Sequence, residues 1–244
     1  MNIIGIDPSL ISTAVVVNGK IFNYCRESDA VNKSGYSKWF KLAEERATYK
    51  FIKYREFKSY SEGELVKLKD YDHITDAIIS DILENIEPSQ ETFIGIEGYN
   101  FGASVGDLVD LVTFSTVLRK KLFDQVSQNI TVLSPKTLKQ ESCKLTYPPI
   151  DIGKKKPKLQ WRNKEGIAGG HFTKREMFLA IVENDNLNDD WGKHCKSIAA
   201  DLLENKTIKK PYEDVNDAYL IYHILIKLVS NSSSFSDIIS DEEE

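Results

Sequence analysis

Two short apolar runs that each end in an acidic residue constrain the fold of this chain most. The run at residues 2–6 leads to Asp7, and the run at residues 93–96 leads to Glu97. Runs of this length, rich in isoleucine, predict buried strands. A carboxylate at the end of a buried strand is costly unless it holds something positive. The two runs therefore predict strands of one sheet with acids at a functional edge.

Two further acids, Asp214 and Asp217, open a long apolar helical pattern at spacing i, i+3. This spacing places both carboxylates on one helical face, the same face as the apolar stripe that would pack on the sheet. Asp214 could instead be a helix N-terminal charge that favours the helix dipole. If three or four of these acids converge, their oxygens would form a divalent-metal site.

The remaining pattern predicts short strands followed by alternating helices and strands. We expect strands at 2–7, 12–18, 20–25, 92–97 and 130–133, and helices at 72–86, 104–125, 173–184, 196–205 and 212–230, with another helix starting at Ser134-Pro135. Asn18-Gly19 is typical of a tight hairpin. Residues 26–70 could form a strand pair or an inserted arm, and residues 144–170 a loop or irregular arm.

This order of elements predicts an α/β fold. The first three strands would form an antiparallel meander, and the later strands would be parallel because helices connect them. We therefore expect a mixed five-stranded sheet flanked by helices. The serine-rich and acidic tail at 231–244 is predicted to be disordered.

Charge is distributed unevenly along the chain, although the whole carries −5. Residues 134–175 contain eleven basic and three acidic residues, a net +8, so the remainder is strongly acidic. This asymmetry favours a basic surface for a polyanion, with a solvated lysine-rich loop as the alternative.

Other function classes find little support in the composition. The three cysteines lack C-x-x-C spacing, and the four histidines form no metal-ligand pattern. No apolar run is long enough to span a membrane, and the N-terminus shows no signal peptide, so we expect a cytoplasmic protein.

Four segments resemble, in order, the motifs of the RuvC-type Holliday junction resolvases, which belong to the RNase H-like nucleases. They are Gly5-Ile6-Asp7-Pro8-Ser9, Ile94-Gly95-Ile96-Glu97, Leu133-Ser134-Pro135-Lys136-Thr137-Leu138-Lys139-Gln140 and Asp214-Val215-Asn216-Asp217-Ala218. The resemblance spans most of residues 1–230 and implies one RNase H-like nuclease domain. The long segments at 26–70 and 144–170 would be insertions, as in the viral and phage branch, whose proteins act inside a host cell.

The resemblance implies a two-metal nuclease that resolves branched DNA as a homodimer. Two Mg²⁺ ions, for which Mn²⁺ could substitute, would be held by Asp7, Glu97, Asp214 and Asp217. Lys139 and Lys174 match catalytic lysines of the family, which could also serve only to position phosphate.

The resemblance also implies an aromatic residue beside the metal site that stacks on a DNA base, here Tyr99 or Phe101. A core aromatic is the alternative. Further DNA contacts are expected from the basic stretch; these residues are Lys136, Lys154, Lys155, Lys156, Lys158 and Arg162.

Three other functions remain open at this point. Helix 104–125 lacks the small-residue pattern of the bacterial resolvases, which favours a less selective debranching nuclease that cuts flaps and Y-structures. An actin-like or sugar-kinase ATPase also begins with a strand-end aspartate, but a glycine pair does not follow Asp7 here. A nuclease-dead binding module would not need the acids.

Overall fold

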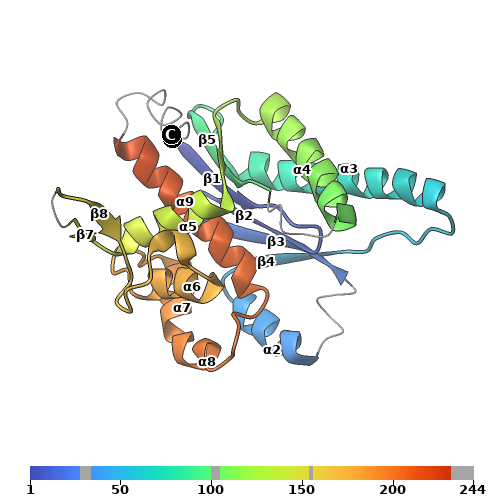
Figure 1. Ribbon diagram of the computed structural model, residues 1–244. Coiled ribbons are helices and arrows are strands. Elements are labelled where there is room, and N and C mark those ends of the chain that lie inside the picture. The colour runs from blue at the N-terminus through green and yellow to red at the C-terminus, as the bar shows by residue number, and fades with distance from the viewer. Residues whose placement is uncertain (28–33, 100–104, 154–155, 232–244) are drawn as a thin grey trace.

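A mixed six-stranded sheet forms the centre of the computed structural model, with helices on both faces (Figure 1). The structure describes residues 1–27, 34–99, 105–153 and 156–231. The strands of the main sheet are β1 (Asn2–Asp7), β2 (Ser12–Val17), β3 (Lys20–Arg26), β4 (Thr48–Ile52), β5 (Thr92–Glu97) and β6 (Ile130–Leu133). The helices are α2 (Ser34–Ala43), α3 (Tyr60–Asn85), α4 (Val105–Gln125), α5 (Pro135–Thr146), α6 (Lys174–Val182), α7 (Asp190–Ser197), α8 (Ala199–Leu203) and α9 (Tyr212–Asn231), with a short 3-10 helix, η1 (Gly169–His171).

The strand order, β4-β3-β2-β1-β5-β6, confirms an α/β fold with a mixed sheet. Strands β1, β2 and β3 form the predicted antiparallel meander. Strand β5 pairs in parallel with β1, and β6 pairs in parallel with β5, as the intervening helices predict. The carboxyl ends of β1 and β5 therefore meet at one edge of the sheet.

The predicted count of five strands is wrong, because β4 joins the edge of the sheet in parallel with β3. On one side of β4, the ring of Tyr49 lies 5.2 Å from that of Phe40 in α2. On the other side, Lys50 Nζ reaches Asp81 in α3 at 2.7 Å. An edge strand tolerates such a charge, and the lysine obscured the apolar alternation by which a strand is recognised.

Three further boundaries differ from the prediction. Helix α3 begins at Tyr60 instead of residue 72, and its first half extends past the sheet, where no apolar stripe is needed (Figure 1). The predicted helix 196–205 is divided between α7 and α8. The segment 144–170 contains an antiparallel pair, β7 (Pro149–Asp151) and β8 (Leu159–Trp161).

The two faces of β1 contact different helices. Ile4 and Ile6 belong to the apolar cluster that includes side chains of α3 and α4. Ile3 points to the other face, where it packs with Phe93 and with Leu225 of α9. Because side chains alternate along a strand, Gly5 and Asp7 share the α9 face. This arrangement positions the candidate site.

Within the described residues, no helix combines the length and the apolar character needed to cross a membrane. The predicted tail lies outside the described residues from position 232 onward.

Candidate metal centre

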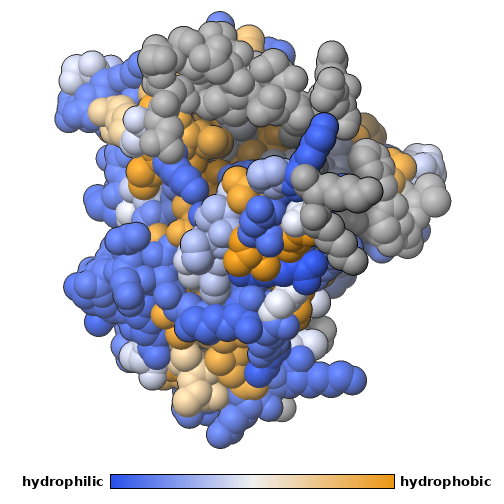
Figure 2. Space-filling view, turned by 60° about the vertical axis from the view of Figure 1, so that its left-hand side comes forward, coloured by the Kyte–Doolittle hydropathy of each residue, from blue (hydrophilic) through white to orange (hydrophobic). Residues whose placement is uncertain are grey.

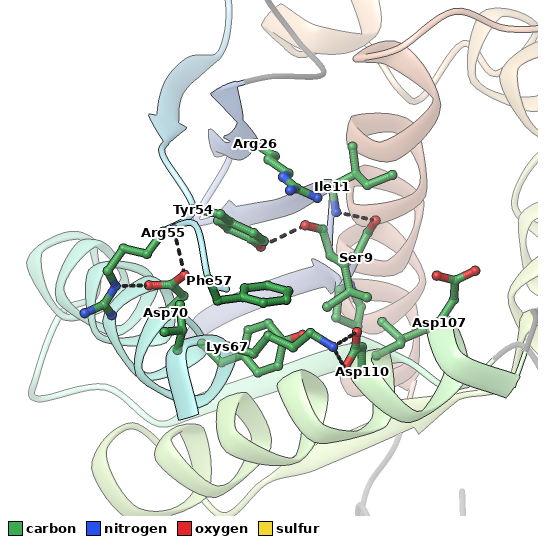
Figure 3. A pocket seen from close by; sticks show the side chains of 15 residues that line it. Ser9, Ile11, Arg26, Tyr54, Arg55, Phe57, Lys67, Asp70, Asp107 and Asp110 are labelled. Carbon is green, nitrogen blue, oxygen red and sulfur yellow. Dashed lines mark hydrogen bonds and ion pairs between the residues drawn. The ribbon is translucent and has the colours of Figure 1, made fainter. Parts of the chain in front are cut away.

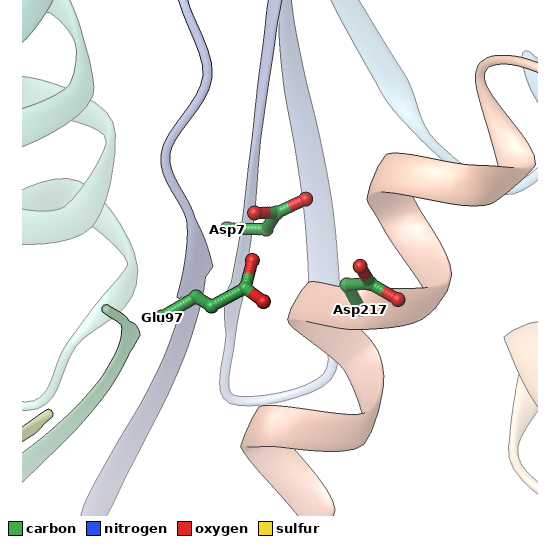
Figure 4. A group of neighbouring side chains, drawn as sticks. All are labelled: Asp7, Glu97 and Asp217. Carbon is green, nitrogen blue, oxygen red and sulfur yellow. The ribbon is translucent and has the colours of Figure 1, made fainter. Parts of the chain in front are cut away.

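Three acidic residues from distant parts of the chain converge at the carboxyl edge of the sheet (Figure 4). Asp7 ends β1, Glu97 ends β5, and Asp217 lies in the second turn of α9. One carboxylate oxygen from each lies within 4.8 Å of the other two. We call these residues the acidic triad. The structure thus brings together three of the four acids that the sequence singles out.

Two facing glycines allow α9 to approach closely enough to complete the triad. Gly5 and Gly95 are partners in the parallel pair of β1 and β5. A Cβ atom on Gly5 would lie 2.3 Å from the backbone oxygen of Ala218, which directly follows Asp217. A Cβ atom on Gly95 would lie 2.7 Å from the side chain of Ile221. Each glycine precedes its strand-end acid by two residues, a spacing that is visible in the sequence.

Burial and mutual repulsion raise the pKa values of all three acids of the triad. Burial raises the pKa of Asp7 well above its ordinary value, and the charge of Glu97 raises it further. Burial and the charge of Asp217 likewise raise the pKa of Glu97. For Asp217, burial raises the pKa to about 7, although Lys174 opposes the shift. A multivalent cation would compensate this concentrated negative charge.

One oxygen of the triad is buried without a partner. Asp217 Oδ1 accepts no hydrogen bond from the described residues, although its side chain is only 1% exposed. Buried acceptors nearly always have a partner. Because the three side chains offer only carboxylate oxygens, the site fits a hard cation such as Mg²⁺ or Mn²⁺.

Lys174 supplies a positive charge to the triad. It opens α6, where Thr173 caps the helix and Glu176 completes a capping box. Its ammonium group forms an ion pair with Asp217 Oδ2. Burial lowers the pKa of Lys174, but the attraction of the acidic triad outweighs this effect and raises the pKa overall. Lys174, one of the two predicted site lysines, therefore lies at the acidic triad.

Asp214 has a different partner. Its two carboxylate oxygens accept hydrogen bonds from Lys210 Nζ at 2.8 and 3.0 Å, and its side chain is 6% exposed. It is not among the residues whose oxygens lie within 4.8 Å of one another, but its charge raises the pKa of both Asp7 and Asp217. Lys210, which lies four residues before Asp214 and precedes α9, was not predicted as a site residue from the sequence.

We expect Asp214→Asn to weaken Mg²⁺ binding much less than Asp217→Asn. Asp214 would act on the metal through charge, and changes at residues that support a ligand typically cost about 10-fold to 100-fold in affinity. Asp217→Asn removes a charge and a ligand together and should exceed that range. The measurement is the Mg²⁺ concentration that gives half of the maximal thermal stabilisation. Equal losses would mean that Asp214 also binds the metal.

Lys139 and Tyr99 lie next to Glu97. The half-buried Lys139, in α5, lowers the pKa of Glu97 by its charge. Tyr99 lies under the guanidinium of Arg119, whose carbon is 4.5 Å from the ring centroid. Arg119 also donates a hydrogen bond from Nη2 to the Glu97 carbonyl at 3.1 Å. Phe101, the other predicted stacking residue, lies outside the described residues.

The basic stretch is partly exposed and partly engaged within the protein. Lys136, Lys156 and Lys158 are exposed. Arg162 closes its own loop by donating to Gln160 Oε1 at 2.8 Å and to a backbone carbonyl. Figure 2 shows that hydrophilic side chains dominate the β7 and β8 side of the molecule, interrupted by smaller hydrophobic patches. Two more predicted DNA contacts, Lys154 and Lys155, lie outside the described residues.

No protein-family model matches this chain, and no curated protein matches it. Function is therefore inferred from the site itself and from the sequence motifs.

Proposed function

We propose that this chain is a divalent-metal-dependent endonuclease that cuts branched DNA, with an RNase H-like fold similar to that of the RuvC-type resolvases. The acidic triad carries the proposal, because its acids come from the first strand, its parallel neighbour and the last helix. Within the six-stranded sheet, the antiparallel meander β1–β3 and the parallel strands β5 and β6 support it, because an RNase H-like sheet would contain both, whereas β4 is additional to them. Cleavage of two symmetric strands would need two active sites, and hence a homodimer.

Each residue at the site has a role in this proposal. Asp7, Glu97 and Asp217 would hold the two Mg²⁺ ions, which would supply charge stabilisation during phosphodiester hydrolysis. Lys174 and Lys139 would offset negative charge on the phosphate. Tyr99 and Arg119 would present a flat surface to an unpaired base.

One assay tests the function directly. Purified protein is incubated with Mg²⁺ and a four-way junction, a flap, a fork or linear duplex, and the products are mapped at single-nucleotide resolution. Paired nicks at symmetric positions in the four-way junction would support the proposal. Equal cutting of flaps and forks would favour the debranching nuclease. The protein is also incubated with Mg²⁺ and ATP. Hydrolysis of ATP together with DNA that stays intact would contradict the nuclease and support the ATPase.

We expect Mg²⁺ or Mn²⁺ to support cleavage and Ca²⁺ to support DNA binding without turnover. Mg²⁺ requires near-octahedral coordination at short distances, whereas Ca²⁺ accepts longer and looser coordination that would misplace the reacting groups. The measurement pairs cleavage rates with gel-shift affinities for each ion. Undiminished cleavage in excess chelator would rule out a metal-dependent reaction.

We also expect the lysines of the β7–β8 connection to contribute DNA affinity through phosphate contacts. Replacing Lys154, Lys155, Lys156 and Lys158 with alanine should weaken binding to all DNA structures alike. The log–log salt slope should fall by about 0.9 for each lost phosphate contact. Lys193→Ala and Lys206→Ala, two exposed lysines outside the basic stretch, are the matched controls. A salt slope equal to that of the controls would show that this connection faces away from DNA.

A further inference from the structure

A cavity of about 530 Å³ opens one residue beyond Asp7, on the α3 and α4 side of the sheet (Figure 3). Its lining comes from the turn after β1, the end of β3, the segment after β4, and the facing surfaces of α3 and α4. We call it the Tyr54 pocket. Its volume lies within the range of about 300–1,000 Å³ that is typical of small-ligand sites. The metal chemistry proposed above makes no use of it.

The polar groups of the walls are held in place by one another. Tyr54 donates its hydroxyl to a backbone carbonyl of the turn after β1 at 2.8 Å. The carboxylate of Asp70 in α3 accepts two hydrogen bonds from Arg55. The backbone N–H of Arg55 donates one at 3.1 Å, and its Nε donates the other at 2.5 Å. Lys67 links α3 to α4 by donating to both oxygens of Asp110, at 3.1 and 2.9 Å. These contacts preform the pocket and satisfy most of its wall charges.

Other side chains of the pocket remain available to a ligand. Phe57 is 48% exposed and Ile11 is 43% exposed, although both line a concave site. The guanidinium of Arg26 lies 4.8 Å from the ring centroid of Tyr54, and no carboxylate among the described residues pairs with it. The pocket thus combines an apolar, aromatic surface with an available positive charge at its mouth.

This combination selects the chemical class of the ligand. An aromatic ring next to aliphatic side chains suits a flat base, because every base has a face that can stack. A guanidinium suits a phosphate. Across the pocket from Arg26, α4 contributes the carboxylates of Asp107 and Asp110 (Figure 3). Because a carboxylate has about four lone-pair sites, these groups can also accept hydrogen bonds from the exocyclic amino group of a base, although Lys67 already binds Asp110.

We propose that the Tyr54 pocket holds one unpaired nucleotide of the bound DNA, with its base against Phe57 and its phosphate beside Arg26. This inference rests on the proposed function. Pro8 and Ser9, which follow Asp7 directly, belong to the pocket lining, so the pocket adjoins the carboxyl end of β1 that carries Asp7, and the inference places a neighbouring nucleotide of the bound strand there. Seating that nucleotide requires it to leave its base pair, which selects branched DNA over duplex.

The test compares pocket variants with matched controls in one binding and cleavage assay. Phe57→Ala removes the stacking surface, and Phe57→Tyr retains it. Tyr60→Ala removes an aromatic side chain that is 81% exposed, three residues away and outside the pocket lining. Arg26→Gln is compared with Lys53→Gln, which removes a nearby exposed charge. Binding to a four-way junction and a fork is measured by fluorescence anisotropy in Ca²⁺, and cleavage is measured in Mg²⁺.

Phe57→Ala should weaken binding to branched DNA by on the order of 10-fold, as expected for one lost stacking contact. Phe57→Tyr, which retains the stacking surface, should bind like the wild-type protein. Arg26→Gln should reduce the salt slope by about 0.9. A panel of junctions, each with one abasic site, should contain a position at which wild-type binding falls by a similar factor. Phe57→Ala should be insensitive to base removal at that position.

Two outcomes would overturn the inference and are readily distinguished. If the wild-type protein cuts branched DNA but Phe57→Ala and Arg26→Gln behave like Tyr60→Ala and Lys53→Gln, the pocket does not hold a nucleotide and the nuclease stands. If the wild-type protein neither binds nor cuts any of the DNAs, the proposed function fails, and the pocket inference fails with it.

Discussion

Asp7→Asn should reduce cleavage of branched DNA by several orders of magnitude while leaving DNA binding intact. Asparagine keeps the size of the side chain but removes a negative charge and one of the two carboxylate oxygens. Asp7 forms the acidic triad together with Glu97 and Asp217 (Figure 4), and these residues would hold the metal ions of the proposed nuclease. Binding should survive, because in the proposed nuclease the phosphate contacts would come mainly from lysine and arginine elsewhere.

The same substitution should change metal-dependent stability in a way that does not depend on activity. A ligand that binds only the folded state raises its stability, so Mg²⁺ should raise the melting temperature of the wild-type protein but not that of Asp7→Asn. In chelator at pH 7 the variant should melt at or above the wild-type temperature. The pKa of Asp7 in the folded state is raised, which means that its ionised form destabilises the fold.

The sign of this effect fixes its pH dependence. A raised carboxyl pKa makes wild-type stability fall as pH rises above the unfolded value of about 4. The advantage of Asp7→Asn in chelator should therefore be absent near pH 4 and should grow toward pH 7. Differential scanning fluorimetry across this range measures it directly.

A buried aspartate outside the triad provides the matched control. Asp81 in α3 is 7% exposed, similar to Asp7 at 6%, but Lys50 and Tyr24 already bind its carboxylate. Asp81→Asn should lower stability and leave the response to Mg²⁺ unchanged. Wild-type cleavage by Asp7→Asn would contradict the assignment of the metal site.

The meeting of Asp7 and Glu97 was predictable because local rules position both residues. Strand periodicity puts Asp7 and Glu97 at the ends of buried strands, and parallel pairing brings those ends together. The position of Asp214 outside the acidic triad was not predictable, because it depends on how α9 is rotated against the sheet. That rotation places Asp217 beside Asp7 and Glu97, and it places Asp214 in an ion pair with Lys210.

Strand β4, the first half of α3 and the Tyr54 pocket were harder to predict from the sequence. Strand β4 and the first half of α3 lack an apolar stripe, because one lies at a sheet edge and the other extends past the sheet. The Tyr54 pocket combines side chains from segments up to about a hundred residues apart in sequence. No sequence spacing relates Arg26 or Phe57 to Asp107, so only the three-dimensional fold reveals the pocket.

The close approach of α9 to β1 at Gly5 should make Gly5→Ala one of the most damaging single substitutions in the chain. A Cβ at this position would lie 2.3 Å from the Ala218 oxygen and 2.6 Å from the Tyr222 nitrogen. Both are backbone atoms, so no side-chain rotation can relieve the overlap, and the helix itself must move. Overpacking of a core typically costs about 1–3 kcal/mol, and we expect Gly5→Ala to reach or exceed the upper end of that range.

The damage should extend to the metal centre, because the helix that must move carries Asp217. Gly5→Ala should therefore lose the Mg²⁺-dependent rise in melting temperature even where it remains folded. Gly95→Ala should be milder, because its Cβ would meet the side chain of Ile221, which can shift. Gly106→Ala in α4 is the control: its Cβ would meet no atom within 4 Å, so alanine should stabilise the helix by about 0.5–1 kcal/mol. Melting temperatures with and without Mg²⁺ measure all three variants, and a Gly5→Ala protein as stable as Gly106→Ala would show that α9 does not pack on β1 as described.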